Sequence, residues 1–313
     1  MSQTNTTTMF IGLDVAKSSV QLHLAGQLHS LANDSKGHAK LLKLLRPYPT
    51  AHVICEATGG YEQPPVRVLQ DAGVAVSIIE AGRVRHFAKA KGLRAKTDPI
   101  DAAVLTQYGQ TFAPAPMPVA SPCQRHLAQW ATRRRQLVDL KVIETNRAEH
   151  YADAFSRKQS RQLLLFLEKQ IAQCEQQITQ LIAKDQSLLT KAKRLETIAG
   201  VGPATSATIL AHLPELGNLN RNTAAALAGV APYNKDSGNL SGPRHIAGGR
   251  KTVRCALYMA ALSAVRHERI FKAFYQRLLA AGKKPIVALT AVMRKLIVLM
   301  NRLLKNPHFQ LAP

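Results

Sequence analysis

The feature that most constrains the fold of this chain is a stretch of 77 residues, Cys123 to Ala199, without glycine or proline. A single α-helix of that length would measure about 115 Å at 1.5 Å per residue, so we expect two or three helices. Within it, apolar side chains recur at alternating steps of three and four residues, at Leu164, Leu167, Ile171, Cys174, Ile178 and Leu181. This heptad pattern predicts an antiparallel hairpin, a subunit interface, or a helix in the core of one subunit.

The residues before this stretch alternate between apolar runs and helical patterns, which is typical of an α/β domain with a mixed sheet. We predict strands at 9–14, 20–24, 27–31, 52–55 and 74–79, and helices at 36–46, 63–72 and 98–108. Residues 114–122 contain four prolines and are predicted to be a linker.

Glycine and proline return after Ala199, and the last third of the chain is predicted to be mostly helical. Its helical patterns cover 203–212, 222–230, 252–267, 269–281 and 285–304, with a glycine-rich basic loop at 231–251. The chain is therefore predicted to have three parts: an α/β domain at 1–120, a helical stalk or coiled coil at 121–195, and a helical domain at 196–313.

The chain is strongly basic, with 42 Lys and Arg against 19 Asp and Glu, a formal net charge of +23. The excess grows along the three predicted parts, from +4 to +7 to +12. Such a distribution favours nucleic acid over a membrane surface as the partner. We expect no membrane partner, because no apolar run reaches the ~20 residues needed to cross a bilayer. The N-terminus lacks a secretory pattern and the four cysteines lie far apart, which together predict a cytoplasmic protein without a zinc knuckle.

Four acidic residues stand at the predicted edges of structured elements. Asp14 and Glu56 each end an apolar strand, and Asp98 and Asp101 lie three residues apart at a helix start, on one face. If the two strands are parallel neighbours, their carboxylates meet at one edge of the sheet. Such a cluster is suited to Mg²⁺, with Mn²⁺ as an alternative. Taken singly, each has a simpler explanation as a turn former, a strand end or a helix cap.

Six segments of the chain resemble, in order, the conserved blocks of one family. They are FIGLDVAKSSV, ICEATGGYE, LRAKTDPIDA, LETIAGVGPATSATIL, AALAGVAPYNKDSG and GGRKTVRCALYMAALSA. They are similar to those of the DEDD insertion-sequence transposases, which include Piv-type DNA invertases and bridge-RNA-guided recombinases. The resemblance implies a RuvC-like, ribonuclease-H-type fold for residues 1–120, with Asp14, Glu56, Asp98 and Asp101 as the metal-binding tetrad. It also implies double-stranded DNA as substrate, a guide (bridge) RNA, and dimers that assemble into tetramers.

The resemblance further implies that Ser237, in the Ser237-Gly238 dipeptide, is a nucleophile. A hydroxyl next to glycine in a loop can approach a phosphodiester closely. Nearby cations suited to neutralising phosphoryl oxygens are Lys235, Arg244, Arg250, Lys251 and Arg254. No general base stands beside Ser237 in the sequence. Ser241 is the second candidate, and a serine that only solvates the loop is the simpler explanation.

Two further segments are candidate nucleic-acid contacts. Gly200 and Gly202 lie in a turn that resembles a helix–hairpin–helix, which can offer backbone N–H groups to a phosphate. A plain connection between helices is the alternative. Six cations before Asp98 predict a path for phosphates into the carboxylate site: Arg83, Arg85, Lys89, Lys91, Arg94 and Lys96.

The sequence thus predicts a site-specific DNA recombinase that forms a transient phosphoserine link at Ser237, assisted by metal ions at the tetrad. One alternative is a Holliday-junction nuclease that hydrolyses DNA with metal-activated water. A second is a scaffold that binds nucleic acid without catalysis. Aromatic residues make up 5% of the chain, so sequence reading by base stacking on the protein is expected to be minor.

Overall fold

The computed structural model describes residues 8–93, 98–234, 242 and 244–310, and of residues 98–100 it describes the backbone alone. The chain forms two compact units, Met1–Val119 and Ala120–Pro313. A mixed α/β unit precedes a mostly helical one, which confirms the predicted fold class. The further division of the second unit at residue 195 stays a prediction. In the part of the chain that the structure describes, no helix has the length and apolar character to span a membrane.

The first unit is built on a five-stranded sheet in the order β3-β2-β1-β4-β5. The strands are β1 (Met9–Val15), β2 (Ser19–Leu24), β3 (Gln27–Ala32), β4 (Ala51–Glu56) and β5 (Ala75–Ile79). The first three form an antiparallel meander, whereas β4 pairs parallel with both β1 and β5. All five strands lie where the apolar runs predict them. The parallel pairing of β1 with β4 brings the ends of these two strands to the same edge.

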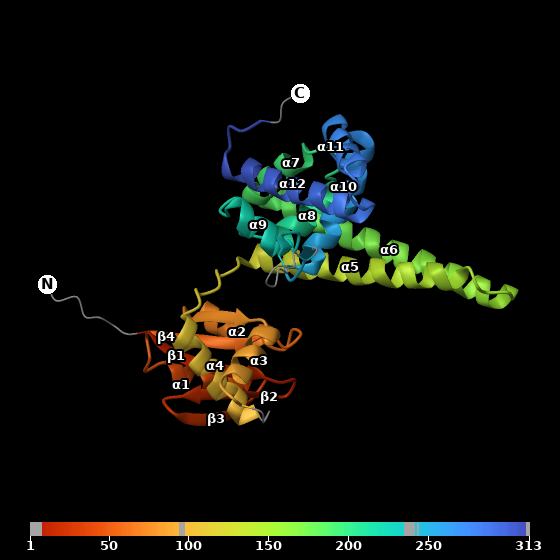
Figure 1. Ribbon diagram of the computed structural model, residues 1–313. Helices are drawn as coiled ribbons and strands as arrows, with labels where there is room; N and C mark the ends of the chain where they lie inside the picture. The colour runs from red at the N-terminus through yellow and green to blue at the C-terminus, as the bar shows by residue number, and fades with distance from the viewer. Residues whose placement is uncertain (1–7, 94–97, 235–241, 243, 311–313) are drawn as a thin grey trace. The chain divides into compact units, whose positions relative to one another are not determined.

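Helices cover both faces of the sheet. One core joins the sheet to α1 (Ser35–Leu45) and α2 (Gln63–Asp71), and the other joins it to α3 (Ala81–Ala90) and α4 (Asp98–Phe112) (Figure 1). The interior strand β4 is buried on both faces because its neighbouring residues Val53 and Ile54 belong to opposite cores. Helix α3 was not predicted: its segment was interpreted only as a cluster of cations.

Helix α4 lies very close to β1, and the sequence of β1 permits this approach. The amide of Gly12 donates to the hydroxyl of Thr106 over 2.8 Å. A Cβ atom on Gly12 would lie 1.9 Å from the carbonyl oxygen of Ala102. Only glycine therefore fits here, and the contact fixes the position of α4, whose first turns carry Asp98 and Asp101.

The second unit begins with a helical hairpin of α5 (Pro122–Ala148) and α6 (Ala154–Lys184), which lie side by side in Figure 1. Ion pairs join Arg134 to Glu175 at 2.6 Å and Lys141 to Glu168 at 2.8 Å. From Arg134 to Lys141 the number rises by seven on α5, while from Glu175 to Glu168 it falls by seven on α6. The two helices are therefore antiparallel. All six heptad positions of α6 are buried or half-buried. Of the predicted alternatives, the hairpin is observed, and the end of α6 also joins the core of the second unit through Ile178. A subunit interface stays a prediction.

The rest of the second unit consists of a helical core and a small two-stranded antiparallel ribbon. It contains α7 (Gln186–Glu196), α8 (Pro203–His212), α9 (Arg221–Leu227), β6 (Pro232–Tyr233), β7 (His245–Ile246), α10 (Lys251–His267), α11 (Arg269–Ala280) and α12 (Pro285–Lys305). Apolar residues of α5 and α6 share one core with these helices. The helices lie close to the predicted ranges, and the stretch without glycine or proline accounts for three of them.

The buried histidine of β4 makes the stability of the first unit depend on pH. The Ser77 hydroxyl donates to the carbonyl of Ala115, so Nε2 of His52, 2.9 Å from that hydroxyl, is the donor to it. Burial lowers the pKa of His52 from its ordinary value of 6.5. Because the folded state resists protonation of His52, the neutral imidazole contributes fully to the stability of the first unit above pH 6.5. That contribution is lost as the pH falls below this value.

We therefore expect the unfolding temperature to fall between about pH 7.5 and about pH 5.5, as measured by circular dichroism. His52→Gln should reduce this pH dependence, whereas His86→Gln, at an exposed position of α3, should not. Burial also lowers the pKa values of His38 and His212, so part of the dependence remains in the variant. An unchanged pH dependence in His52→Gln would contradict the assignment.

Candidate active site

Two of the four predicted carboxylates stand side by side at one edge of the sheet. Leu13 of β1 is paired with Cys55 of β4, so Asp14 and Glu56 occupy the next position on neighbouring parallel strands. Both residues are half-buried. On the neighbouring position of β4, burial raises the pKa of the Cys55 thiol, and the negative charges of Glu62, Asp14 and Glu56 raise it further.

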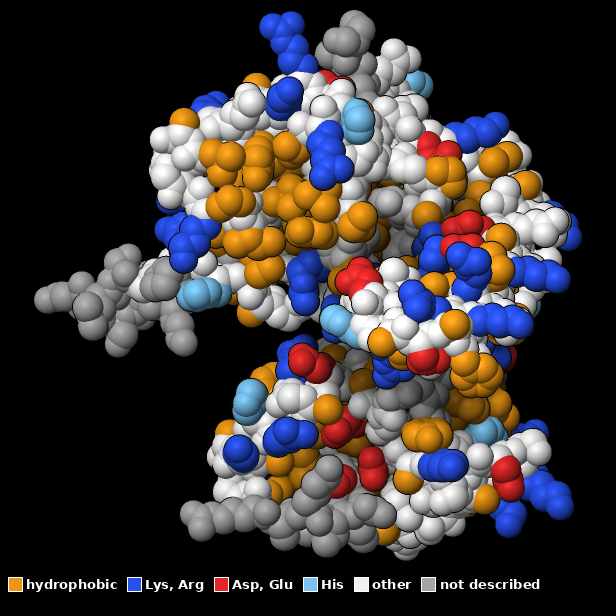
Figure 2. Space-filling model, turned by 90° about the vertical axis from the view of Figure 1, so that its right-hand side faces the viewer, with side chains coloured by type: hydrophobic (Ala, Val, Ile, Leu, Met, Phe, Trp, Pro, Cys, Tyr) orange, Lys and Arg blue, Asp and Glu red, His pale blue; other side chains and the backbone are white. Residues whose placement is uncertain are grey.

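The third carboxylate, Asp101, is carried by helix α4. Glu56 and Asp101 both line a pocket of about 580 Å³ formed by the end of β4, helix α3 and helix α4. Figure 2 shows Asp and Glu side chains gathered on one face of the first unit, a local exception in a protein of net charge +23. The backbone of Asp98 begins α4, and its side chain lies outside the described residues. The structure thus brings Asp14, Glu56 and Asp101 to one edge of the first unit.

The donor set suits a hard divalent cation. Among the described side chains, no group of three or more His, Cys, Asp or Glu could by itself hold a metal ion. Carboxylate oxygens are nevertheless the protein ligands that Mg²⁺ prefers, and this ion usually binds through one or two carboxylates while keeping several waters and substrate phosphates. Asp14 and Glu56 at adjacent strand ends, and Asp101 in the pocket that Glu56 lines, offer carboxylates of this kind.

A fifth acidic residue, Glu62, shapes the loop after Glu56 and was not singled out from the sequence. Its carboxylate accepts hydrogen bonds from the amide and hydroxyl of Thr58, from the amide of Gly60 and from the side chain of Gln63. Burial alone would raise its pKa, but these hydrogen bonds outweigh burial and lower the pKa. Glu62 therefore stays ionised and holds the turn that follows Glu56. The sequence signal that could have singled out Glu62 is its position shortly after Gly59 and Gly60, where a turn is expected.

The cations of α3 divide into two groups. Arg85 and Lys89 line the pocket together with Glu56 and Asp101. Arg83 and Lys91 are instead engaged with α4: the guanidinium of Arg83 lies 5.9 Å from the Tyr108 ring, and Lys91 donates to the side chain of Gln107 over 2.8 Å. Arg94 and Lys96, predicted to continue the series, lie outside the described residues.

The predicted serine loop is described only at its two ends. Ser237, Ser241 and Lys235 lie outside the described residues. The flanking strands β6 and β7 pair antiparallel, with Tyr233 opposite His245, so the two ends of the loop are held together. Arg244 and Lys251 are exposed. The side chain of Arg254 donates to the carbonyl of Gly248 over 2.8 Å.

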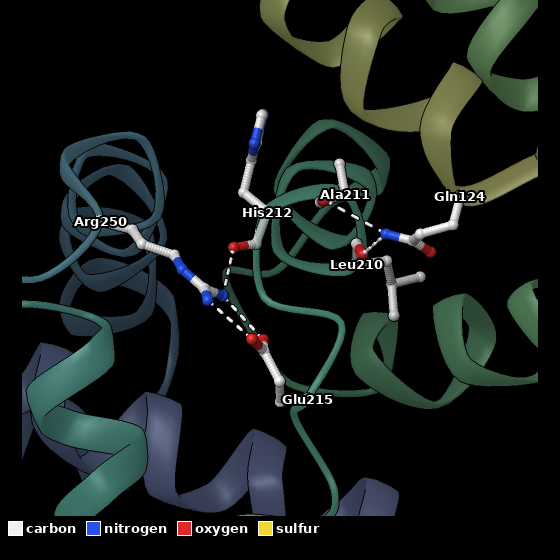
Figure 3. A network of polar contacts seen from close by, with 6 residues as sticks. All are labelled: Gln124, Leu210, Ala211, His212, Glu215 and Arg250. Atoms are coloured by element: carbon white, nitrogen blue, oxygen red, sulfur yellow. Dashed lines mark hydrogen bonds and ion pairs between the residues drawn. The ribbon is translucent and has the colours of Figure 1, made fainter. Parts of the chain in front are cut away.

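Arg250, predicted to contact phosphate, is tied to the protein itself. Its guanidinium donates to both carboxylate oxygens of Glu215, each over 2.7 Å, and to the carbonyl of His212 over 2.8 Å (Figure 3). The bidentate pair lowers the pKa of Glu215. Arg250 thus anchors the start of α10 to the end of α8. A direct contact between Arg250 and phosphate stays a prediction.

This geometry separates two neighbouring cations by experiment. Arg250→Gln should lower the free energy of unfolding by about 1–2 kcal/mol, because it removes a bidentate charged hydrogen bond. Lys251→Gln removes the same charge from an exposed position and should leave stability unchanged. Chemical denaturation of both variants measures the difference. Equal stability of the two variants would show that the pair does not anchor α10.

The two glycines of the predicted phosphate-binding turn differ in their surroundings. Gly200 has a φ of +89°, and a Cβ on it would lie 2.6 Å from the carbonyl oxygen of Ala260. Close packing against α10 therefore requires this glycine. Gly202 is exposed and precedes α8 without a side-chain cap, and a Cβ on it would meet no atom within 4 Å. Of the two glycines, Gly202 is the one that remains open to a ligand, and phosphate binding by the turn stays a prediction.

Comparisons with known proteins point to one family. Residues 11–156 match the family model of the DEDD transposase of IS110, described as a transposase, and residues 192–276 match that of the transposase IS116/IS110/IS902 family. The chain is 26% identical to the pilin gene-inverting proteins of Moraxella lacunata and Moraxella bovis. Each comparison covers 95% of this chain and 96% of the relative. A DEDD transposase domain implies the use of divalent metal ions, DNA binding and phosphoryl transfer on DNA. These two matches, in chain order over both units, show that the chain belongs to the IS110 family of DEDD transposases.

Proposed function

We propose that the protein is a site-specific recombinase that cuts and rejoins double-stranded DNA at the pocket between β4, α3 and α4. The observation that carries this proposal is the arrangement of Asp14 and Glu56 at adjacent strand ends, with Asp101 lining the same pocket as Glu56. Arg85 and Lys89 in that pocket supply positive charge for the phosphate of a bound strand.

The four carboxylates Asp14, Glu56, Asp98 and Asp101 are the proposed ligands for Mg²⁺, with Mn²⁺ as a substitute. When bound, such an ion neutralises phosphoryl oxygens and polarises the reacting oxygens. The chain holds two of these carboxylates on the rigid end of a buried sheet. It holds the other two on α4, which is fixed against β1 through Gly12. This rigidity serves the accuracy that phosphoryl transfer requires.

Ser237 is the proposed nucleophile. A bond forms between its Oγ and phosphorus as the bond from phosphorus to the 3′ oxygen breaks, and the proton of the serine ends on the freed 3′ hydroxyl. In the second step the 3′ hydroxyl of another strand attacks the phosphoserine, and the serine hydroxyl is restored. The number of phosphodiester bonds is unchanged, and no water is consumed. The proposal requires Ser237 to reach the carboxylate pocket, either in one chain or between two copies.

The names of the similar Moraxella proteins support rejoining over simple hydrolysis. Inversion of a pilin gene, the activity those names state, needs every cut strand to be joined to a new partner. A nuclease that uses water would leave broken ends. Strand exchange is therefore favoured for this chain over the nuclease alternative.

The decisive experiment is to trap a covalent protein–DNA adduct on a denaturing gel. Wild type and Ser241→Ala should give the adduct with a suicide substrate, whereas Ser237→Ala should give none. Cutting by Ser237→Ala without recombination would favour the nuclease. Unchanged DNA products after Asp14→Ala or Glu56→Ala would favour the non-catalytic scaffold.

We also propose that a guide RNA selects the target and that the active form is a dimer that assembles into a tetramer on DNA. The small share of aromatic residues leaves few side chains for stacking on bases, which supports delegation of sequence reading to RNA. Sequencing the RNA that copurifies with the protein tests this point. A defined RNA from the flank of the element is expected, and random cellular RNA would contradict guidance.

A further inference from the structure

A groove on the second unit combines an apolar floor with a cationic border. It has a volume of about 550 Å³ and lies between α11 and α12. Its floor includes Phe271 and Phe274, and its outer wall includes Ile270, whose side chain is 69% exposed. Figure 2 shows apolar side chains gathered on one face of this unit with Lys and Arg side chains beside them. A monomer exposes an apolar surface of this kind mainly where it binds something.

The border of the groove carries positive charge. Arg294, Lys295 and Arg302 line it, and none of the described residues that line it is acidic. The Nζ atom of Lys295 lies 4.1 Å from the centre of the Phe274 ring, so cation and aromatic ring already form one surface. Residues 269–313 contain nine Lys and Arg and no Asp or Glu. The complementary partner is therefore an anion with apolar faces.

Arg294 and Arg302 suit a ligand that is extended along the helix. They are eight residues apart on α12, so they lie on one face about 12 Å apart along the helix axis, with Val298 between them. Cations along α12 beside an apolar floor match a chain of phosphates with exposed bases. Duplex DNA hides its bases in the stack and offers no apolar face to such a floor.

We propose that the groove between α11 and α12 binds single-stranded nucleic acid, with phosphates on Arg294 and Arg302 and unstacked bases against Ile270 and Phe274. The proposal rests on the proposed function only in taking nucleic acid as the partner of the chain. The residues that line the groove differ from those that line the carboxylate pocket, and helix α12 lies beyond the residues that either family model matches. An acidic protein helix is the competing occupant.

The test measures binding by fluorescence anisotropy with the full chain and a labelled single strand of about 12 nucleotides, within the known range of site sizes. Arg294→Gln with Arg302→Gln should bind about tenfold more weakly, and the slope of log K against log salt should fall by about 1.4, since each single-strand phosphate contact contributes about 0.7. Lys283→Gln with Lys284→Gln removes the same charge outside the groove and should change neither quantity appreciably. Equal losses in the two double variants would overturn the proposal.

A second pair of variants tests the apolar wall of the groove. Ile270→Ser should weaken single-strand binding about fivefold, because a base loses its apolar contact. Ile286→Ser, at a 57% exposed position outside the groove, is the matched control and should bind like wild type. RNA and DNA single strands should both compete with the labelled strand. With duplex DNA added, Ile270→Ser should still bind the labelled strand more weakly than Ile286→Ser. Unchanged binding by Ile270→Ser would leave the groove to an acidic protein and end the proposal.

All these measurements are made in the Asp14→Asn background. Strand cleavage then cannot alter the probe, and the result does not depend on whether Ser237 is the nucleophile. Strand transfer itself is measured separately, with the chain that keeps Asp14. Absence of strand transfer there, together with the expected effects of the groove variants on binding, would refute the proposed function alone. Strand transfer there, with no effect of the groove variants on binding, would refute the groove alone.

Discussion

Replacing Glu56 by glutamine is expected to lower the rate of DNA strand cleavage about 10³-fold. Glutamine keeps the size of the side chain but removes the negative charge at the pocket that Glu56 shares with Asp101. A carboxylate that holds a catalytic metal ion contributes several kcal/mol to the transition state, and each 1.36 kcal/mol is tenfold in rate. Cleavage of a labelled DNA substrate under single-turnover conditions measures the change. Asp14→Asn should behave in the same way, because Asp14 is next to Glu56 at the edge of the sheet.

The matched control is Glu80→Gln, the same substitution in the same unit. Glu80 is exposed and precedes α3 without capping it through its side chain. This variant should cleave like wild type. Unfolding temperatures of all three variants should stay close to that of wild type, so that a loss of rate reflects chemistry. Normal cleavage by Glu56→Gln would show that the pocket is not the active site.

Replacing Gly12 by alanine is expected to destabilise the first unit by about 3 kcal/mol, near the upper end of the range for overpacking a core. The new Cβ would lie 1.9 Å from the carbonyl oxygen of Ala102 and 2.8 Å from the amide of Thr106. Both atoms belong to the backbone of α4, so no change of rotamer relieves the clash, and the helix must move. Urea denaturation measures the loss of stability.

The same variant should also lose activity, because α4 carries Asp98 and Asp101. A shift of about 1 Å at a reacting centre can cost about a hundredfold in rate. Gly82→Ala is the control: the nearest atom to its new Cβ would be 3.5 Å away, on the Glu80 side chain, and alanine favours the helix α3. A Gly12→Ala protein as stable as wild type would contradict the close packing of α4 on β1.

Local patterns sufficed for most elements of the fold. Strands β1 to β5 lie where alternating or continuous apolar runs occur, because burial of alternate residues is a local property of a strand. Helix α3 escaped prediction because it buries one residue fully, Val84, and its other contacts are made with α4, as between the rings of Phe87 and Tyr108. The predicted linker is also partly wrong. The amide of Met117 donates to the carbonyl of Val76, so part of this segment lies alongside β5 before the second unit begins.

Pairs that are distant in the chain were beyond sequence reasoning. Arg250 resembles any other cation of a basic loop until the fold brings Glu215 to it from 35 residues away. Gly200 resembles a flexible turn residue until α10 packs against it. In both cases the partner belongs to another helix, and no local pattern reports it. The sequence could therefore suggest phosphate contacts at these positions, but it could not reveal the ion pair of Arg250 or the close packing of Gly200.

The order of amino acids by itself determined which segments become strands and helices, the basic character of the chain and the acids that end β1 and β4. These properties depend on neighbours within a few residues, so periodicity and composition reveal them. Only the tertiary structure decided that β1 and β4 are parallel neighbours and that α4 brings Asp101 to the pocket of Glu56. That convergence depends on strand pairing and on the close contact at Gly12, which join residues up to about ninety positions apart.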